Sequence, residues 1–304
     1  MMKTSDICVT VLRGGPSSER EISLVSGAAV ADACRGLGYQ TVEADISPDD
    51  LGAIAIKTDV VFPVLHGQFG EDGQLQELLE KRQLRYVGSD STASRLSMNK
   101  DATKRVWCQH GLPTAPWTIV DKNSETNLDD IVLPVVVKPC CEGSSVGVAV
   151  CCTKNDIHDA VARLLPVYEK LIVEQRLIGP ELTVGILEDK PLPIIHIKPS
   201  TGFYDFHAKY DRNDTLYILE PEIDDATYRR VQQLAVLAYQ SLGCRDYGRV
   251  DFIVDETLGP QLLEINTIPG FTSHSLLPKA AQHAGINFDR LVDTLIQAAF
   301  ARTY

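Results

Sequence analysis

Residues able to do chemistry are grouped most densely in one stretch of this chain, residues 249–270. It reads as two short apolar strands joined by a polar turn, with Asp251 on the first strand and Glu264 and Asn266 on the second. Two carboxylates and an amide are hard oxygen donors, which suit Mg²⁺ bound together with substrate phosphates. The stretch therefore indicates a metal site, although a charged hairpin face in solvent has the same composition.

The register of this hairpin decides whether the polar side chains meet. Side chains alternate across a strand, so a turn centred between residues 257 and 258 places Asp251 opposite Glu264, and Arg249 opposite Asn266. All four then share one face, and a slip of one residue would separate them. The alternate positions are expected to point into a core; they are Val250, Phe252, Leu263 and Ile265.

Two further candidates follow predicted strands near the N-terminus. Ile7–Leu12 reads as a buried strand, and Ser18 with Glu21 forms a capping-box pattern that predicts a helix to about residue 37. Glu19 lies in the first turn of that helix, and His66 lies on a Gly-punctuated loop after another buried strand. Ligands bind at such strand ends in doubly wound sheets, so both are site candidates. The alternatives are that Glu19 only complements the helix dipole and that His66 is structural.

A third group of candidates suits a nucleotide. Lys138 ends an apolar strand just before residues 142–147, a Gly-Ser-Ser turn whose N–H groups and hydroxyls can cover phosphates. The turn lacks the spacing of a Walker A loop, and a plain hairpin turn is the alternative. Lys100 lies in the first turn of a predicted helix, where a cation is unfavourable unless an anion lies nearby; a lysine exposed to solvent is the alternative. Glu174, in the predicted strand 171–177, can accept hydrogen bonds from a ribose or an adenine amine.

The polar segment 200–215 contains several aromatic residues and has no clear secondary-structure pattern. Loops of this length in compact domains are usually active-site lids or disordered. Lys209 and Tyr210 lie at its centre, so closure of a lid would deliver both side chains to a site.

The elements that must position these groups have the order of an α/β protein. The opening strand, Gly-rich turn and helix are typical of a doubly wound parallel sheet, and later runs of consecutive strands indicate an α+β part. The predicted strands are 7–12, 42–44, 59–64, 135–138, 148–151, 171–177, 182–187, 192–198 and the two strands of the hairpin; the predicted helices are 18–37, 74–82, 91–97, 99–110, 155–164, 224–243, 275–284 and 289–300.

Bulk properties exclude several classes of function. Apolar content is 44% and the formal net charge is -12, which argues against non-specific binding to nucleic acid or anionic membranes. The first apolar run is too short for a signal peptide, and no run approaches the ~18–20 apolar residues of a membrane span. We therefore expect a cytoplasmic protein. Its eight cysteines include the neighbours Cys140-Cys141 and Cys151-Cys152, which lack CxxC spacing and read as reduced thiols without an assigned function.

Six motifs follow one another along essentially the whole chain. They are Gly14-Gly15-x-Ser-x-Glu19-Arg-Glu21, His66-Gly-x-x-Gly-Glu-Asp-Gly73, Lys138-Pro, Glu142-Gly-Ser-Ser-x-Gly147, Tyr247-Gly-Arg249-x-Asp251 and Glu264-x-Asn266-Thr-x-Pro-Gly270. Each is weak alone, but the six in this order resemble the D-alanine–D-alanine ligases of the ATP-grasp superfamily. The chain departs from the usual pattern of that family at Cys140-Cys141, Arg176 and Ile268.

This resemblance implies a three-domain ATP-grasp fold. An N-terminal α/β domain would span residues 1–90, a central domain with the phosphate-binding loop residues 91–178, and a C-terminal domain with the metal site and the lid residues 179–304. The enzyme would join two D-alanines through an acyl phosphate, using ATP and usually two Mg²⁺ (or Mn²⁺) ions, for peptidoglycan precursors. Such enzymes are cytoplasmic and usually homodimers.

The resemblance also implies roles for individual residues. The positions that match nucleotide contacts are Lys100, Lys138, Glu142, Ser145, Glu174, Leu177, Glu181 and the lid residue Lys209. The positions that match metal ligands are Asp251, Glu264 and Asn266. The positions that match substrate-binding and catalytic residues are Glu19 for the first ammonium group, Ser144 and Tyr210 for lid closure, and Arg249, Gly270 and Ser275 for the second substrate and the oxyanion. His66 or the departing phosphate would deprotonate the attacking amine.

Two alternatives to this function stay open. One is a ligase of the same fold with D-lactate or D-serine as the second substrate; Tyr210 after Lys209, and His66 in its loop, favour the dipeptide-forming type. The other is a regulatory protein that binds a nucleotide or an amino acid and has lost the chemistry. Because all the metal-ligand positions are filled, the residues argue against it.

Overall fold

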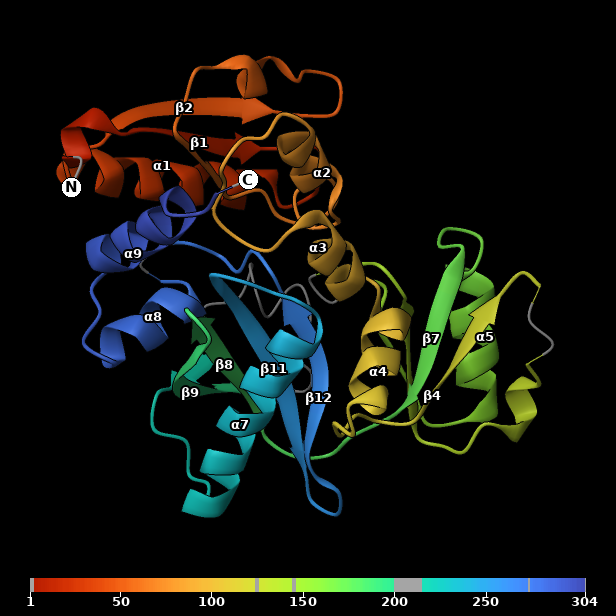
Figure 1. Ribbon diagram of the computed structural model, residues 1–304. Helices are drawn as coiled ribbons and strands as arrows, with labels where there is room; N and C mark the ends of the chain where they lie inside the picture. Colours follow the sequence, from red (N-terminus) through yellow and green to blue (C-terminus); the bar gives the residue numbers. More distant parts are fainter. Residues whose placement is uncertain (1–2, 124–125, 144–145, 200–214, 273, 304) are drawn as a thin grey trace.

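The structure, a computed structural model, describes residues 3–123, 126–143, 146–199, 215–272 and 274–303. Its strands form three sheets, and helices pack against each of them (Figure 1). The first sheet is parallel and the other two are antiparallel. This arrangement confirms the expected mixed α/β class. Across the described ranges, no helix combines the length and the apolar character needed to span a bilayer.

The described strands are β1 (Cys8–Gly14), β2 (Gln40–Ile46), β3 (Val60–Pro63), β4 (Trp117–Asp121), β5 (Val135–Pro139), β6 (Ala149–Cys151), β7 (Lys170–Gln175), β8 (Glu181–Leu187), β9 (Lys190–Lys198), β10 (Leu216–Ile218), β11 (Tyr247–Asp255) and β12 (Gly259–Asn266). The described α-helices are α1 (Arg20–Gly36), α2 (Gln74–Lys81), α3 (Ser91–Met98), α4 (Lys100–Gln109), α5 (Lys154–Leu164), α7 (Asp225–Ser241), α8 (Leu276–His283) and α9 (Phe288–Phe300). Short 3₁₀ helices lie at Thr4–Asp6, Gly52–Ala55 and Leu128–Asp130. Strands β4 and β10 were not predicted.

The first sheet has the strand order β2-β1-β3, and both of its faces are covered. Because side chains alternate along β1, Val9 and Val11 pack in one core with α1 and α9, whereas Leu12 packs in another core with α2. Because helices cover both faces of this sheet, a ligand can reach it at the carboxyl ends of its strands. Glu19 and His66 follow two of those ends, as expected.

The start of α1 differs from the predicted capping box. The helix begins at Arg20 with Glu19 as its N-cap residue, and no side chain caps it. Ser17, rather than Ser18, makes the local contacts: its hydroxyl accepts from the Glu19 N–H at 3.2 Å and donates to the His66 carbonyl at 2.7 Å. The capping-box prediction was therefore wrong, and the same loop instead ties the two predicted site residues together.

The second and third sheets have the strand orders β4-β7-β5-β6 and β10-β9-β8-β11-β12. Helix α5 packs on the second sheet, and α7 packs on the third. Helices α3 and α4 join the core of the third sheet, where buried Trp107 donates to the carbonyl of Ala238 in α7 at 3.3 Å. Helix α9 packs on α1, which covers the first sheet, and also on α8, which packs on β8 and β9 of the third sheet (Figure 1). These helices therefore join the first sheet to the third.

The hairpin of β11 and β12 has the predicted register at its polar positions. Asp251 pairs with Glu264, and Arg249 pairs with Asn266. The antiparallel pairing of β11 with β8 places Thr183 beside Asp251 on the other side. The two carboxylates expected on one face therefore do face one another.

Beyond Asp251 the hairpin departs from simple alternation. A β-bulge between Asp251 and Phe252 shifts the pairing, so Phe252 lies opposite Leu262. Leu262 is fully buried, and Leu263 instead lines a cavity. The prediction that Leu263 points into the core was wrong, because an apolar pattern does not reveal an extra residue in one strand.

The bulged register predicts different losses of stability for alanine substitutions at two neighbouring leucines. Leu262→Ala should lower the free energy of unfolding by about 2–5 kcal/mol, because it empties a core position. Leu263→Ala, the same change one residue away, should cost no more than about 1 kcal/mol, because this side chain is only partly buried. Chemical denaturation of both variants measures the difference. Equal losses, or a larger loss for Leu263→Ala, would contradict the bulged register.

Candidate active site

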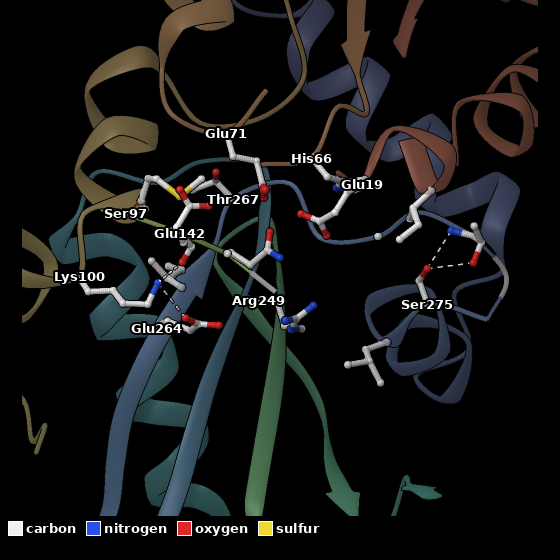
Figure 2. Close-up of a pocket in the computed structure, with 18 of the residues that line it drawn as sticks. Glu19, His66, Glu71, Ser97, Lys100, Glu142, Arg249, Glu264, Thr267 and Ser275 are labelled. Atoms are coloured by element: carbon white, nitrogen blue, oxygen red, sulfur yellow. Dashed lines mark hydrogen bonds and ion pairs between the residues drawn. The ribbon is translucent and has the colours of Figure 1, made fainter. Parts of the chain in front are cut away.

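Two adjoining cavities lie where the three sheets meet. The strand-end cavity, of about 300 Å³, lies between the loops after β1 and β3 and the end of β12 (Figure 2). The intersheet slot, of about 360 Å³, lies between the second sheet and the third. Lys100, Glu142 and Glu264 line both cavities. A group transferred from a ligand in one cavity to a ligand in the other would pass these residues.

The intersheet slot combines apolar walls with a few charged side chains. Val136 of the second sheet and Leu263 of the third contribute apolar surface, and Leu177 lies in the segment that links the two sheets. Lys138 and Glu181 add charges to the lining. Apolar walls suit a flat base, and convergent polar groups suit hydroxyls and phosphates, so the slot has the chemistry of a nucleotide site.

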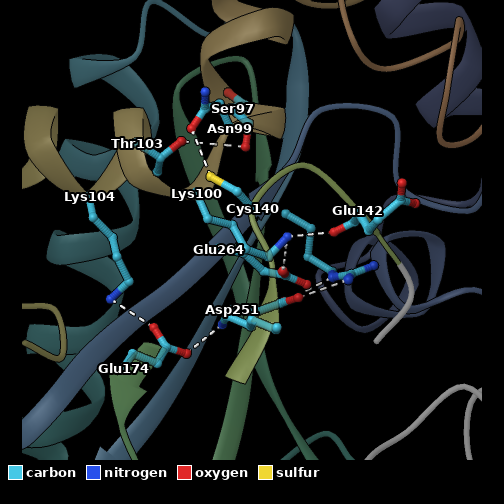
Figure 3. A network of polar contacts seen from close by, with 12 residues as sticks. Ser97, Asn99, Lys100, Thr103, Lys104, Cys140, Glu142, Glu174, Asp251 and Glu264 are labelled. Carbon is cyan, nitrogen blue, oxygen red and sulfur yellow. Dashed lines mark hydrogen bonds and ion pairs between the residues drawn. The ribbon is translucent and has the colours of Figure 1, made fainter. Parts of the chain in front are cut away.

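Glu174 is buried in this slot between two lysines (Figure 3). Its Oε1 lies 2.5 Å from Lys138 Nζ, and its Oε2 lies 3.1 Å from Lys104 Nζ. Burial by itself raises the pKa of Glu174, but the two lysine charges outweigh it and lower the pKa to about 2. The carboxylate expected to meet a ribose or an adenine amine is therefore charged and holds two cations in place.

Lys104 is a residue that sequence reasoning missed. It is fully buried, and its Nζ donates to Thr114 Oγ1 at 2.5 Å and to the Ala115 carbonyl at 3.1 Å. The same ammonium group lies 5.2 Å from the centre of the Trp117 ring. A lysine one turn into a helix looks like a solvent-exposed residue, so no feature of the sequence marks it.

The oxygen donors expected to hold a metal meet at the end of the hairpin. Arg249 Nε and Nη2 donate to the two oxygens of Asp251, each at 2.9 Å, and Thr183 Oγ1 donates to Asp251 Oδ1 at 2.5 Å. Glu264 Oε2 lies 3.3 Å from Lys100 Nζ (Figure 3). Asn266 Oδ1 accepts from the backbone of the loop that follows, at 3.1 Å. Cations therefore balance both carboxylates.

This donor set is chemically suited to Mg²⁺ or Mn²⁺ but is incomplete by itself. Within the described part of the chain, no group of three or more His, Cys, Asp or Glu side chains is placed to hold a metal ion. Mg²⁺ binds through one or two carboxylates and fills its remaining positions with water and phosphate oxygens. Asp251, Glu264 and Asn266 fit such an ion at the edge of a nucleotide slot.

His66 lines the strand-end cavity and is held by one hydrogen bond of its ring. Its Nδ1 donates to the Ile268 carbonyl at 3.0 Å, and its buried Nε2 has no hydrogen-bond partner among the described residues. Burial lowers the pKa of His66, so the ring is neutral, with the lone pair on Nε2. Glu19 lines the same cavity and is buried.

Glu71 is a second residue that sequence reasoning did not assign, although it lies within the quoted His66 motif. Its carboxyl group accepts from the Gly67 N–H at 2.6 Å and from the Ile268 N–H at 3.3 Å. It therefore joins the loop after β3 to the loop after β12. Burial and the nearby charge of Glu19 raise the pKa of Glu71 to about 8, so it holds its proton at neutral pH.

The far end of the strand-end cavity is formed by the segment before α8. Ser275 is the N-cap residue of α8, and its Oγ accepts from the Thr272 N–H at 3.1 Å. A Cβ built on Gly270 would lie 2.9 Å from Ser275 Oγ, so a glycine allows this close approach of the backbone. Ile22 and Leu276 add apolar surface, which suits a small apolar side chain.

Every predicted site residue that the structure describes lines at least one of the two cavities. The strand-end cavity holds Glu19, His66, Lys100, Glu142, Arg249, Glu264, Asn266, Gly270 and Ser275. The intersheet slot holds Lys100, Lys138, Glu142, Glu174, Leu177, Glu181, Asp251 and Glu264. Four predicted residues lie outside the described residues: Ser144, Ser145, Lys209 and Tyr210.

The two cavities and the three sheets define an ATP-grasp ligase, and known proteins agree. A family described as "D-ala D-ala ligase C-terminus" matches residues 106–297, and one described as "D-ala D-ala ligase N-terminus" matches residues 42–89. The D-alanine–D-alanine ligase of Syntrophotalea carbinolica is 40% identical over 298 residues, which cover 97% of this chain and 96% of that protein.

Solved structures share the whole fold. The crystal structure of the D-alanine–D-alanine ligase from Bacillus anthracis has a TM-score of 0.88 and 33% identity, covering 96% of this chain and 97% of that one. The same enzyme complexed with ATP has a TM-score of 0.84. The VanG D-Ala:D-Ser ligase from Enterococcus faecalis has a TM-score of 0.86 and 27% identity, covering 96% and 99%. The chain belongs to the D-alanine–D-alanine ligase family.

The buried Lys104–Glu174–Lys138 group predicts a pH-dependent loss of stability. Lys104→Met should lower the free energy of unfolding by about 3–5 kcal/mol at neutral pH, because it leaves a buried carboxylate with one cation. Because the folded-state pKa of Glu174 is lowered, its contribution is present above its ordinary pKa and is lost as pH falls toward about 2. The difference between Lys104→Met and the unmodified protein should therefore shrink in acid.

The matched control is Lys81→Met, which removes an exposed lysine 2.7 Å from Glu77. It should change the free energy of unfolding by no more than about 1 kcal/mol at any pH. Denaturant titrations at several pH values measure both variants. A Lys104→Met protein as stable as the control at neutral pH would show that Glu174 does not depend on Lys104.

Proposed function

We propose that this chain joins two D-alanines, using ATP, to form D-alanyl-D-alanine, ADP and phosphate for peptidoglycan precursors. Membership of the ligase family supports the reaction. The observation that carries the proposal is the contact of two cavities of different chemistry at Lys100, Glu142 and Glu264. In this proposal ATP occupies the intersheet slot and the amino acids occupy the strand-end cavity.

The proposed first step activates a carboxylate. A carboxylate is a poor acyl donor, so ATP transfers its γ-phosphoryl group to the first D-alanine and leaves ADP. Glu19 would hold the ammonium group of that D-alanine, and Lys100 and Lys138 would hold phosphate charge. Two Mg²⁺ or Mn²⁺ ions, held by Asp251, Glu264 and Asn266, would neutralise further charge on the phosphates.

The proposed second step forms the peptide bond. The amine of the second D-alanine attacks the acyl phosphate, and the tetrahedral intermediate carries an oxyanion. Arg249 and the Gly270 N–H would stabilise that oxyanion, and Ser275 would hold the carboxylate of the second substrate. For the proton of the attacking amine, neutral His66 with its free Nε2 is one acceptor, and the departing phosphate is the other.

Some parts of the proposal rest on the resemblance alone. Ser145 would contact the nucleotide, Ser144 and Tyr210 would form hydrogen bonds that help to close the lid, and Lys209 would lie near the transferred phosphate. The closed lid would keep water from the acyl phosphate. The proposal also includes three domains, a homodimer and a cytoplasmic location. The domains would span residues 1–90, 91–178 and 179–304. The alternative acceptors, D-serine and D-lactate, require the same fold; one relative of that fold is a D-Ala:D-Ser ligase.

The deciding experiment measures ATP-dependent phosphate release with D-alanine, with L-alanine, and with D-alanine plus D-lactate or D-serine. Release with D-alanine alone, and a D-alanyl-D-alanine product by mass, is expected. A preference for the mixed product would move the function to another acceptor. Bound ATP without release for any of these substrates would favour a regulatory protein that has lost the chemistry.

The metal assignment makes a separate prediction. Glu264→Gln should fold normally but lose at least about 100-fold in kcat, because one ligand loses its charge. Glu256→Gln, the same change at the exposed turn of the same hairpin, should leave kcat unchanged. Steady-state kinetics at rising Mg²⁺ compare the two. A near-normal kcat for Glu264→Gln at saturating Mg²⁺ would remove Glu264 from the metal site.

A further inference from the structure

Two adjacent cysteines lie beside the intersheet slot and have no part in the proposed reaction. Cys140 and Cys141 follow β5, directly between Lys138-Pro139 and Glu142. Cys140 is buried, with 1% of its surface exposed, and Cys141 is exposed to solvent. The pair therefore combines a thiol inside the protein with one that solvent reaches.

Cys140 is built into the contacts that position Lys100 (Figure 3). Its Sγ donates to Asn99 Oδ1 at 3.3 Å, and Asn99 is the N-cap residue of α4. Its carbonyl accepts from the Lys100 N–H at 3.0 Å, and Lys100 Nζ donates to the Glu142 carbonyl at 2.6 Å. A change in the backbone at residues 140–142 would therefore move the lysine shared by the two cavities.

The groups around Cys140 also favour reaction of its thiol with that of Cys141. The neighbouring Cys141 thiol lowers the pKa of Cys140 most, and the Asp101 N–H and the charge of Lys100 lower it further, although burial and the charge of Asp101 act in the opposite direction. A thiolate is the nucleophilic form of cysteine, and a thiol beside a second thiol can form a disulfide once it is oxidised.

We propose that Cys140 and Cys141 are an oxidation site at which peroxide forms a disulfide that weakens ATP binding. The inference rests on the proposed ATP site in the intersheet slot. Two thiols give two electrons and two protons to one peroxide molecule, which is reduced to two water molecules, while one S–S bond replaces two S–H bonds. A dithiol reductant reverses the step by exchange.

The bond would disturb the backbone that holds Lys100. Adjacent Cα atoms lie about 3.8 Å apart across a trans peptide, whereas a disulfide usually joins Cα atoms about 4.4–6.8 Å apart. Because the peptide bond fixes the spacing of adjacent Cα atoms, the ring can close only if the backbone torsion angles at residues 140–141 change, and the thiol donor to Asn99 is lost. Weakening one charged hydrogen bond to a phosphate corresponds to roughly a tenfold loss of affinity.

The chain contains a matched internal control. Cys151 and Cys152 are also adjacent, with one buried and one exposed thiol. Burial raises the pKa of Cys151, whose Sγ donates only to the nearby Ala149 carbonyl, at 3.8 Å. Within the described ranges, no hydrogen bond joins this second pair to Lys100 or to a residue that lines either cavity, so its oxidation should leave ATP binding unchanged.

The experiment compares the reduced full-length protein with its Cys141→Ser and Cys152→Ser variants during titration with hydrogen peroxide. Mass spectrometry of the peptide with residues 140–141 reports loss of two hydrogen atoms, and titration with ATP reports affinity. We expect the wild type and Cys152→Ser to form the disulfide and lose ATP affinity by about tenfold, with recovery in dithiothreitol. Cys141→Ser should keep its affinity.

Three results would overturn the proposal. They are a disulfide that leaves ATP affinity unchanged, an equal loss of affinity in Cys141→Ser, and residues 140–141 that stay reduced or pass to sulfinic acid while affinity falls. Phosphate release by the reduced wild type with D-alanine is measured in parallel. Its absence would count against the proposed function, whereas the disulfide and its effect on ATP affinity would still be scored separately.

Discussion

The ion pair of Lys100 with Glu264 is the contact on which the arrangement of the site depends. It joins the first residue of α4 to the end of β12, and Lys100 also holds the loop after β5 through the Glu142 carbonyl. Parts of the chain that are far apart in sequence thus converge on one ammonium group. Because both cavities are lined by Lys100 and Glu264, a shift of this pair changes the two cavities together.

Other buried carboxyl groups of the site are also either paired with cations or neutral. Glu174 lies between two lysines, and Asp251 accepts from Nε and Nη2 of Arg249. Glu71 has no cation in these contacts and is neutral because it keeps its proton. Each solution avoids an isolated buried charge, which would be costly. The protein therefore keeps a dense set of acids beside the proposed phosphate site without leaving any of these three carboxyl groups as an uncompensated negative charge.

Sequence reasoning recovered what depends on local periodicity and failed where distant contacts decide. Alternation along the hairpin was enough to pair Asp251 with Glu264, but the bulge that buries Leu262 depends on packing of the third sheet against α3 and α7. Ser18 looked like a helix cap, yet Ser17 makes the contacts because the His66 loop lies beside it. Lys104 resembles a surface residue until Glu174, 70 positions later, is placed next to it.

The separate linings of the two cavities have an evolutionary consequence. Among the described residues, only Lys100, Glu142 and Glu264 line both, so most substitutions in the strand-end cavity leave the intersheet slot intact. Under the proposed function, a lineage can therefore change its acceptor molecule in one cavity while ATP binding in the other stays the same. Divergence of one cavity alone would keep the fold, and this chain does share its fold with a D-Ala:D-Ser ligase.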